Sequence, residues 1–379
     1  MNSTPTHGSL RELAVLFLRL GTTAFGGPAA HIAMMEDEVV HRRGWLTRDE
    51  FLDLVAATNL IPGPNSTEMA IHVGHRRAGW PGLLVAGGCF ILPAALLTLA
   101  LAWLYVRFGT LPAAGGFLGG VKAVILAVVV QALWRLGRSA LRTRFLAFLC
   151  AAATAASALG AHELLVLLAG GLVAALARRA RGFRPQAAAL LAPVLGTAAP
   201  SASAAPFGLW ALFRFFLKTG SVLFGSGYVL LAFLRADLVE RWGWLTEQQL
   251  LDAIAAGQIT PGPVFTTATF VGYVLGGFPG AALATLGIFL PAFVFVAGSG
   301  PLVPRLRRSP AAGAFLDGVI ASSLALMAVV TWQLARAAVV DLPTAALTLG
   351  SAVALFRTRL NSAWLVLGGG VAGLVLSKL

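Results

Sequence analysis

The sequence has few charged residues, and this shortage excludes several classes of protein. Asp, Glu, Lys and Arg make up 11% of the 379 residues, and 58% are hydrophobic, with a mean hydropathy of +0.83. A soluble domain carries about 25% charged residues, so this chain could not cover a water-soluble globule with polar groups. The same composition excludes disorder, and the glycines lack a collagen-like period. What remains is an all-α polytopic membrane protein.

Motifs that carry enzyme chemistry are also missing. Cys89 and Cys150 both lie within apolar runs and belong to no metal-ligand cluster. The chain has no HExxH, GxSxG or GxxxxGK[ST] motif and no soluble domain that could bind a nucleotide. We therefore expect neither an enzyme nor a cofactor nor a metal site. Met1 to Arg11 lacks a basic region before a short apolar core, so we expect no cleaved signal peptide.

What the sequence does contain is an internal duplication. Phe-Gly at 25–26 recurs at 224–225, Trp-Leu-Thr at 45–47 recurs at 244–246, and Pro-Gly-Pro at 62–64 recurs at 261–263. All three pairs have an offset of 199 residues, and the offset continues as 198 as far as Arg138 and Arg336. Residues 1–185 and 208–379 are thus predicted to be homologous repeats, joined by a segment at 186–207.

Each repeat contains six apolar stretches. They lie at 10–34, 51–72, 81–106, 116–137, 144–160 and 162–178, and again at 209–234, 250–271, 280–303, 314–335, 342–357 and 361–377. A further weak stretch at 186–200 gives about 13 membrane segments. Several are shorter than the roughly 20 residues of a straight span, so some helices are expected to tilt or break. The odd number of segments before the second repeat predicts inverted topology, as in many secondary transporters.

The positions of the basic residues test this topology independently. With the N-terminus inside, Arg76, Arg77 and the Arg305–Arg308 segment fall in cytoplasmic loops, and few basic residues fall outside. This asymmetry obeys the positive-inside rule. It also explains the net charge of +13 without a nucleic-acid partner. The segment from Glu36 to Asp53 stays open. It lies outside if its neighbours are full spans, and inside if they are re-entrant hairpins.

Two elements repeat with their helix-breaking residues intact, and they are the candidate anion site. Proline and glycine break helices, and a broken helix at membrane depth is tolerated only inside protein or along a wet cavity. The free N–H groups at such a break bind anions, although a structural kink is the alternative. The candidate residues are Phe25, Gly26, Gly27, Pro62, Gly63, Pro64, Asn65, Ser66, Thr67, Gly225, Ser226, Pro261, Gly262 and Pro263.

Ionisable residues inside the apolar stretches complete the candidate site. Arg19 and its counterpart Lys218, together with Lys122, indicate a negative substrate, unless they extend to the membrane interface. Glu68 follows the first Pro-Gly-Pro, and its counterpart is Thr267. It is either a helix-end carboxylate or a proton-coupling site. The same choice between a structural and a proton-carrying role applies to His31 and His72.

These motifs resemble the chromate transporter (CHR) family. The resemblance is carried by FGGP at 25–28, RRGWLT at 42–47 and LIPGPNSTEMAIHVG at 60–74. FGSG at 224–227, RWGWLT at 241–246 and TPGP at 260–263 are similar to the second domain of the long, two-domain members. The resemblance implies a multi-pass oxyanion transporter of the bacterial inner membrane that exports chromate. It also implies coupling to the proton gradient and competition by sulfate. The second repeat departs from the pattern because it lacks the NSTE segment.

The residues themselves leave several alternatives open. They do not distinguish chromate from sulfate, export from uptake, or proton antiport from flux driven by the membrane potential. An anion channel of the same shape is a competing class, and a membrane-embedded enzyme is disfavoured by the missing motifs. Protons and the lipid bilayer are the other expected partners, and assembly as a homodimer stays open.

Overall fold

The protein is helical throughout the part of the chain that the computed structural model describes. That part comprises residues 7–25, 27–109, 112–179, 206–224, 227–307, 309–358, 360 and 362–376. The predicted crossing at 186–200 lies outside it. The helices of the first half are α1 His7–Thr23, α2 Gly27–Glu36, η1 Asp37–Arg42, α3 Arg48–Thr58, α4 Asn65–Phe108, α5 Pro112–Ala140, α6 Arg144–Ala158 and α7 Glu163–Arg179.

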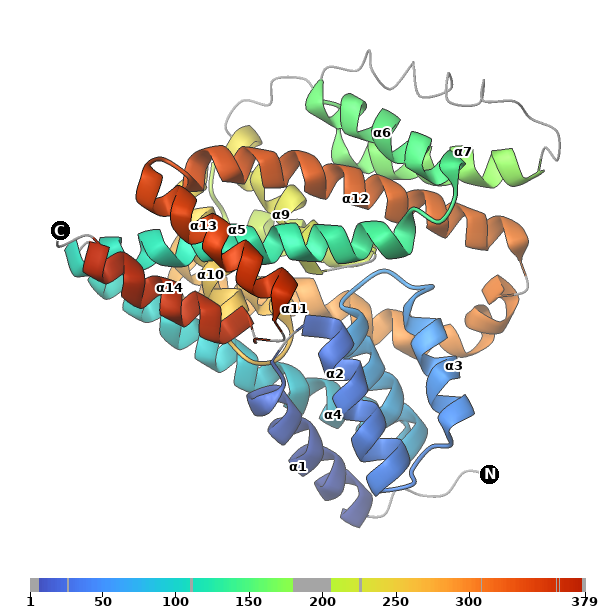
Figure 1. Ribbon diagram of the computed structural model, residues 1–379. Helices are drawn as coiled ribbons and strands as arrows, with labels where there is room; N and C mark the ends of the chain where they lie inside the picture. The colour runs from blue at the N-terminus through green and yellow to red at the C-terminus, as the bar shows by residue number, and fades with distance from the viewer. Residues whose placement is uncertain are drawn as a thin grey trace.

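The second half repeats this order. Its helices are α8 Leu209–Val222, η3 Gly227–Val229, α9 Leu230–Phe233, η4 Leu234–Arg241, α10 Glu247–Ile259, η5 Val264–Thr266, α11 Thr267–Arg307, α12 Pro310–Ala338, α13 Leu342–Arg357 and α14 Ser362–Leu376. Helices η1 and η4 are π-helices, η3 and η5 are 3-10 helices, and the remaining fourteen are α-helices. Figure 1 shows the start of the chain, α1 to α4, as a group below the long helices α5 and α12.

Two helix hairpins open on the same side of the first half. Helix α1 ends at Thr23 and α2 begins at Gly27, and α3 meets the first part of α4 at the Pro-Gly-Pro loop. At the open ends, Arg77 lies 3.4 Å from Glu12 of α1 and 5.1 Å from the ring of Trp45, and Arg76 lies 3.6 Å from Glu50 of α3. In both hairpins the break between the helices therefore lies at one end, and the charged helix termini lie at the opposite end.

Helices α4 and α11 each bend at a glycine with positive φ. Gly79 has φ +61° and Gly277 has φ +60°, the left-handed region that glycine adopts without strain. Beyond the bend each helix continues for about 30 residues, or about 45 Å. Within the described residues, four helices are long and apolar enough to cross a membrane: Asn65–Phe108, Gly115–Ala140, Val264–Ser299 and Pro310–Ala338.

The two halves exchange helices. Figure 1 shows α6 and α7 beside α12, and α13 and α14 beside α5. The glycines make these crossings close, because a Cβ on Gly120 of α5 would overlap Gly369 of α14, and one on Gly318 of α12 would overlap Gly170 of α7. Small residues of this kind let helix backbones approach in a membrane. Each half therefore completes the packing of the other.

At the centre, α4 and α11 cross in opposite directions. Gly87 of α4 faces Phe293 of α11, while Leu83, which is earlier in α4, clusters with Val296, which is later in α11. The two helices therefore run antiparallel where they cross.

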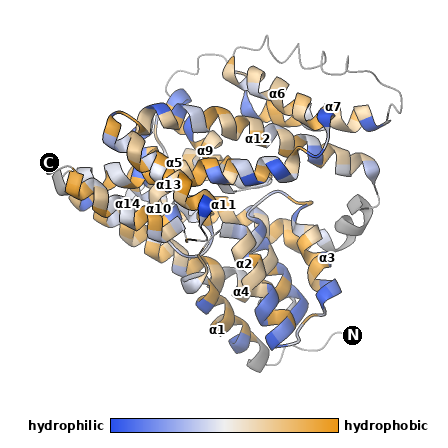
Figure 2. Cartoon of the chain, viewed as in Figure 1, coloured by the Kyte–Doolittle hydropathy of each residue, from blue (hydrophilic) through white to orange (hydrophobic). Residues whose placement is uncertain are grey.

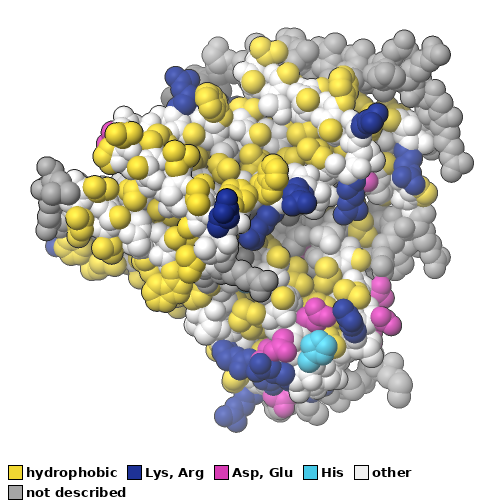
Figure 3. Space-filling view, viewed as in Figure 1, with side chains coloured by type: hydrophobic (Ala, Val, Ile, Leu, Met, Phe, Trp, Pro, Cys, Tyr) yellow, Lys and Arg dark blue, Asp and Glu magenta, His cyan; other side chains and the backbone are white. Residues whose placement is uncertain are grey.

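The surface is apolar over most of the molecule. Figure 2 shows hydrophobic residues along nearly all the helices. Figure 3 shows acidic and basic side chains together around α1 to α3, and further Lys and Arg side chains across the middle of the same face. Bulky residues such as Trp80, Trp210 and Trp364 are more than 60% exposed. Because such a surface is unfavourable in water, the fold is that of a membrane protein whose apolar surface faces the lipid bilayer.

Candidate functional site

The four helix breaks form two pairs, and each pair joins the two repeats through a backbone hydrogen bond. The Gly63 N–H of the first Pro-Gly-Pro loop donates to the Leu223 carbonyl of the second half at 2.8 Å. Reciprocally, the Gly262 N–H of the second loop donates to the Ala24 carbonyl of the first half at 2.8 Å. Each Pro-Gly-Pro loop is thus attached to the Phe-Gly break of the other repeat.

Glycine is required at the centre of both loops. Gly63 has φ +140° and Gly262 has φ +86°, where other residues are strained. A Cβ on Gly63 would overlap the carboxyl group of Glu68, and one on Gly262 would lie 2.7 Å from Cβ of Ala94. The flanking prolines have no N–H to donate, so the helices end here. The repeated motif therefore specifies both the break and the close approach.

Glu68 lies at the centre of the first-half site without a partner. Its side chain is fully buried, and within the described chain neither carboxylate oxygen has a hydrogen-bond partner. The hydroxyl of Thr67 beside it is likewise buried and unpartnered there. His72 follows Glu68 by one helical turn and is also buried. Of these groups, the Glu68 carboxylate lies against the break, beside Gly63 of the Pro-Gly-Pro loop.

His31 attaches α2 to the same site. Its Nε2 donates to the Ala24 carbonyl at 3.0 Å, the same carbonyl that accepts from Gly262, and its ring lies edge-on to Phe90. His31 therefore supports the geometry of the break by linking it to α4. Its other ring nitrogen, Nδ1, is buried without a partner among the described residues.

In the second half, hydroxyl groups occupy the corresponding place. Thr98 of α4 donates to Thr260 at 3.3 Å and to Thr266 at 3.2 Å, on either side of the second Pro-Gly-Pro loop. Thr267, the counterpart of Glu68, donates to the Val264 carbonyl at 2.8 Å. The second break is therefore internally bonded, and it has no ionisable side chain at the position of Glu68.

Arg19 and Lys218 are paired with buried carboxylates in matching positions. Arg19 contacts Glu38, and Lys218 lies 2.8 Å from Asp237. Both carboxylates are on π-helices, which are rare and often mark functional sites. The sequence analysis missed these carboxylates, because Glu38 and Asp237 align at the offset of 199 but are not identical. A search for retained charge, not identity, would have found them.

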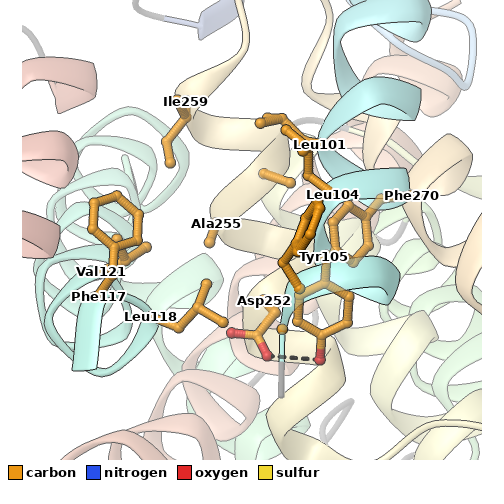
Figure 4. Close-up of a pocket in the computed structure, with 13 residues that line it drawn as sticks. Leu101, Leu104, Tyr105, Phe117, Leu118, Val121, Asp252, Ala255, Ile259 and Phe270 are labelled. Carbon is orange, nitrogen blue, oxygen red and sulfur yellow. Dashed lines mark hydrogen bonds between the residues drawn. The ribbon is translucent and has the colours of Figure 1, made fainter. Parts of the chain in front are cut away.

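Lys122 lies away from the breaks. Its Nζ is 3.0 Å from Asp252 and donates to Gln248 at 2.6 Å, both in the first turns of α10. Asp252 also accepts a hydrogen bond of 3.0 Å from the hydroxyl of Tyr105, which Figure 4 shows at the edge of an apolar cavity of about 280 Å³. The cavity extends to Ile259, next to the second Pro-Gly-Pro loop.

The remaining predicted residues differ in their surroundings. Phe25 is 37% exposed, while Ser66 is buried, and Asn65 donates to Asn59 at 2.9 Å across the first loop. Gly27 has φ +79° at the start of α2. Gly26, Gly225 and Ser226 lie outside the described residues. The structure thus brings each Pro-Gly-Pro loop together with a Phe-Gly break of the other repeat. It holds Arg19, Lys218 and Lys122 in ion pairs with carboxylates.

Long apolar helices, broken at a shared interior site, define a multi-pass membrane protein. Comparison with known proteins identifies which one. The profile of the chromate transporter family matches residues 11–175 and again 210–374, and the chain belongs to this family, in its long, two-copy form. It is a family of transporters and not of enzymes. No solved structure matches the chain.

Individual relatives are similar over nearly their whole length. A chromate transport protein of Cupriavidus metallidurans is 33% identical, covering 99% of this chain and 95% of the relative. A chromate transport protein of Pseudomonas aeruginosa is 35% identical, covering 97% and 93%. An uncharacterized transporter of Methanocaldococcus jannaschii is 27% identical, covering 86% and 85%.

Proposed function

We propose that the protein is an oxyanion transporter of the bacterial inner membrane that exports chromate. The observation that carries this proposal is the pairing of the helix breaks across the repeats, with each Pro-Gly-Pro loop bonded to the Phe-Gly break of the other repeat. In secondary transporters, substrate sites lie near the membrane midplane where broken helices of two repeats meet. The names of the relatives support chromate as the substrate.

The contacts between the halves support inverted topology. From the bend at Gly79, the chain passes along α4, α5 and α6 before it reaches Glu163 at the start of α7. Three crossings bring Glu163 to the side opposite Arg77. Arg241, at the open end of the second-half hairpins, donates to Glu163 at 2.7 Å. The second-half hairpins then open opposite the first, and both pairs are re-entrant, with Glu36 to Asp53 inside.

The anion is held between helix N-termini and exchangeable cations. The N-terminus of α4 at Asn65 and Ser66 points its first N–H groups into the break, where a dianion is favoured. Arg19 is 49% exposed and Lys218 is 38% exposed, so one side of each cation stays available beside its carboxylate. A bound dianion would draw these cations away from Glu38 and Asp237.

Glu68 is the proposed coupling residue. An inside-negative potential already drives a dianion outward, by about 2.3 kcal/mol per charge per 100 mV. A charged Glu68 would repel an anion at the same helix N-terminus, so anion and proton occupancy are linked. If anion and proton bind together, the result is cotransport. If they compete for Arg19, the result is antiport. His72 follows Glu68 by one helical turn, and His31 is bonded to Ala24 at the other pair of breaks. Both are proposed to take part in proton transfer.

Anion counterflow tests the function. Proteoliposomes are loaded with chromate, sulfate, phosphate or chloride, and uptake of labelled chromate is measured with and without a pH gradient. We expect saturable chromate exchange, competition by sulfate, and a response to the pH gradient. Flux that does not saturate and ignores the pH gradient would instead establish an anion channel. Exchange of sulfate without chromate would establish a sulfate transporter.

A further inference from the structure

A separate cavity of about 580 Å³ lies along α8 in the second half. Its lining runs from Ala211 to Ser221 on α8, about 15 Å along the helix axis, and Trp242 closes one side. Ser221 is two residues before Leu223, whose carbonyl accepts the hydrogen bond from Gly63. The cavity therefore leads along α8 to the helix breaks.

Two cations one helical turn apart face this cavity. Lys218 is paired with Asp237, but Arg214 has no carboxylate partner among the residues that the structure describes. Arg241, which precedes Trp242, is paired with Asp237 and Glu163. Arg214 is therefore the cation of this cavity that no carboxylate of the described residues engages, and its planar guanidinium can bind two oxygens at once.

The first half has no equivalent of this arrangement. At the offset of 199, Val15 takes the place of Arg214, and Glu12 takes the place of Ala211. A carboxylate and an apolar side chain at these positions would not favour an anion. The first half has cations at two other positions, Arg19 in place of Lys218 and Arg43 in place of Trp242, and both are paired with Glu38. A guanidinium at the position of Arg214 is therefore confined to the second repeat.

We propose that this cavity is a second oxyanion site, in which Arg214 and Lys218 bind a tetrahedral dianion on its way to or from the helix breaks. The inference rests on the proposed function, because it takes the transported anion as the ligand. Arg214 supplies the free charge, and Lys218 exchanges between Asp237 and the anion. Trp242 lies within contact distance of the bound anion.

Trp242 makes binding measurable. Chromate absorbs in the near ultraviolet, where tryptophan emits, so chromate beside Trp242 quenches its fluorescence by energy transfer. The purified full chain in nanodiscs of neutral phosphatidylcholine is titrated with chromate, and Trp242→Phe identifies the signal among the 9 tryptophans. Arg336→Gln removes an exposed cation of α12 outside the cavity and serves as the matched control.

We expect saturable quenching that sulfate reverses. Arg214→Gln should weaken it by about tenfold or more, since neutral donors do not balance a dianion. Trp242→Phe should lower the amplitude but not abolish it, because the ring of Trp244 lies 4.5 Å from that of Trp242 and is also within range of energy transfer. Arg336→Gln should titrate like the wild type. If Arg214→Gln and Trp242→Phe also titrate like the wild type, the inference is wrong. It is equally wrong if phosphatidylglycerol in the nanodisc abolishes chromate binding, because a lipid headgroup then occupies the cavity.

Counterflow of the same samples separates the two proposals. Wild-type chromate exchange, together with unchanged titrations of both cavity variants, would overturn the cavity site and leave the proposed function standing. Quenching that depends on Trp242 and Arg214, together with no chromate exchange by the wild type, would leave the binding site standing and overturn the proposed function.

Discussion

The two halves share one backbone plan but differ at the side chain that faces each break. In the first half, Glu68 is buried without a hydrogen-bond partner among the described residues. In the second, Thr267 is bonded to the carbonyl of Val264, and Thr98, Thr260 and Thr266 form a hydroxyl cluster. The duplication has therefore supplied the frame twice and the ionisable group once. This asymmetry is what we expect of the proposed coupling role of Glu68, because a residue needed only for the fold would be kept in both repeats.

The ion pairs at the hairpin ends show the opposite behaviour. In the first half, Glu36 lies 3.7 Å from Arg48, and in the second, Arg235 lies 2.5 Å from Glu247. These positions correspond at the offset of 199, so the two charges have changed places while the pair has been kept. Here the pairing matters and the sign does not, which indicates a structural role. This contrast separates residues that hold the frame from those proposed to act on the substrate.

The largest expected effect is at the shared glycines. Gly63→Ala and Gly262→Ala should each reduce chromate counterflow by about tenfold or more, because both have positive φ and no room for a Cβ. Gly88→Ala is the control, since nothing lies within 4 Å of its Cβ position in α4. Equal transport by all three variants would show that the backbone contact between the halves is dispensable.

The next effect distinguishes the two break positions. Glu68→Gln should abolish the pH dependence of chromate flux and leave the flux driven by the membrane potential. Thr267→Val, at the corresponding place, should keep the wild-type pH profile, because Thr267 does not titrate. Flux is measured in proteoliposomes at a fixed potential across a range of pH. A wild-type pH profile in Glu68→Gln would make Glu68 a helix-end residue and place the proton path elsewhere.

Removal of the matching cations should have a smaller effect. Arg19→Ala and Lys218→Ala should each weaken anion affinity by about tenfold, and Gln in either place should do no better. Glu38 would keep Arg42 and Arg43 as partners, whereas Asp237 would keep Arg241 alone. Lys218→Ala should therefore lower the melting temperature more than Arg19→Ala. Unchanged chromate affinity in both variants would show that Arg19 and Lys218 have only a structural role at the ends of their helices.

The smallest effect concerns the helix caps of the repeated Trp-Leu-Thr motif. Thr47 caps α3 with Glu50, and Thr246 caps α10 with Gln249. Either Thr→Ala change should cost about 1 kcal/mol. Hydrogen bonds from Thr47 hold the pKa of Glu50 below its usual value.

A depressed pKa stabilises the fold above the pKa of the unfolded chain, and that stability is lost as the pH falls through the lower, folded value. Thr47→Ala should therefore lower the melting temperature less in acid than at neutral pH. Thr246→Ala should lower it equally at both, because Gln249 does not titrate. The same pH response in both variants would contradict this reading of the two caps.

The sequence analysis predicted the positions of the helix breaks better than it predicted which helices pack against each other. The two Pro-Gly-Pro loops and the Phe-Gly breaks were evident because proline and glycine act locally. The exchange of α6 and α7 for α13 and α14 was not, since Gly120 and Gly318 specify a close crossing without specifying the partner helix. Lys122 was likewise recognised as an intramembrane cation, but its partner Asp252 is 130 residues away in the sequence.

Inverted topology of the two halves is the central claim, and site-directed labelling tests it most directly. Trp80 and Phe278 are corresponding residues just past the two bends, and they are 63% and 60% exposed. Trp80→Cys and Phe278→Cys are made singly in a chain whose Cys89 and Cys150 are replaced by Ala, and intact cells are treated with a membrane-impermeant maleimide. The account predicts that Phe278→Cys is labelled in intact cells and Trp80→Cys only after permeabilisation. Labelling of both from the same side would contradict it.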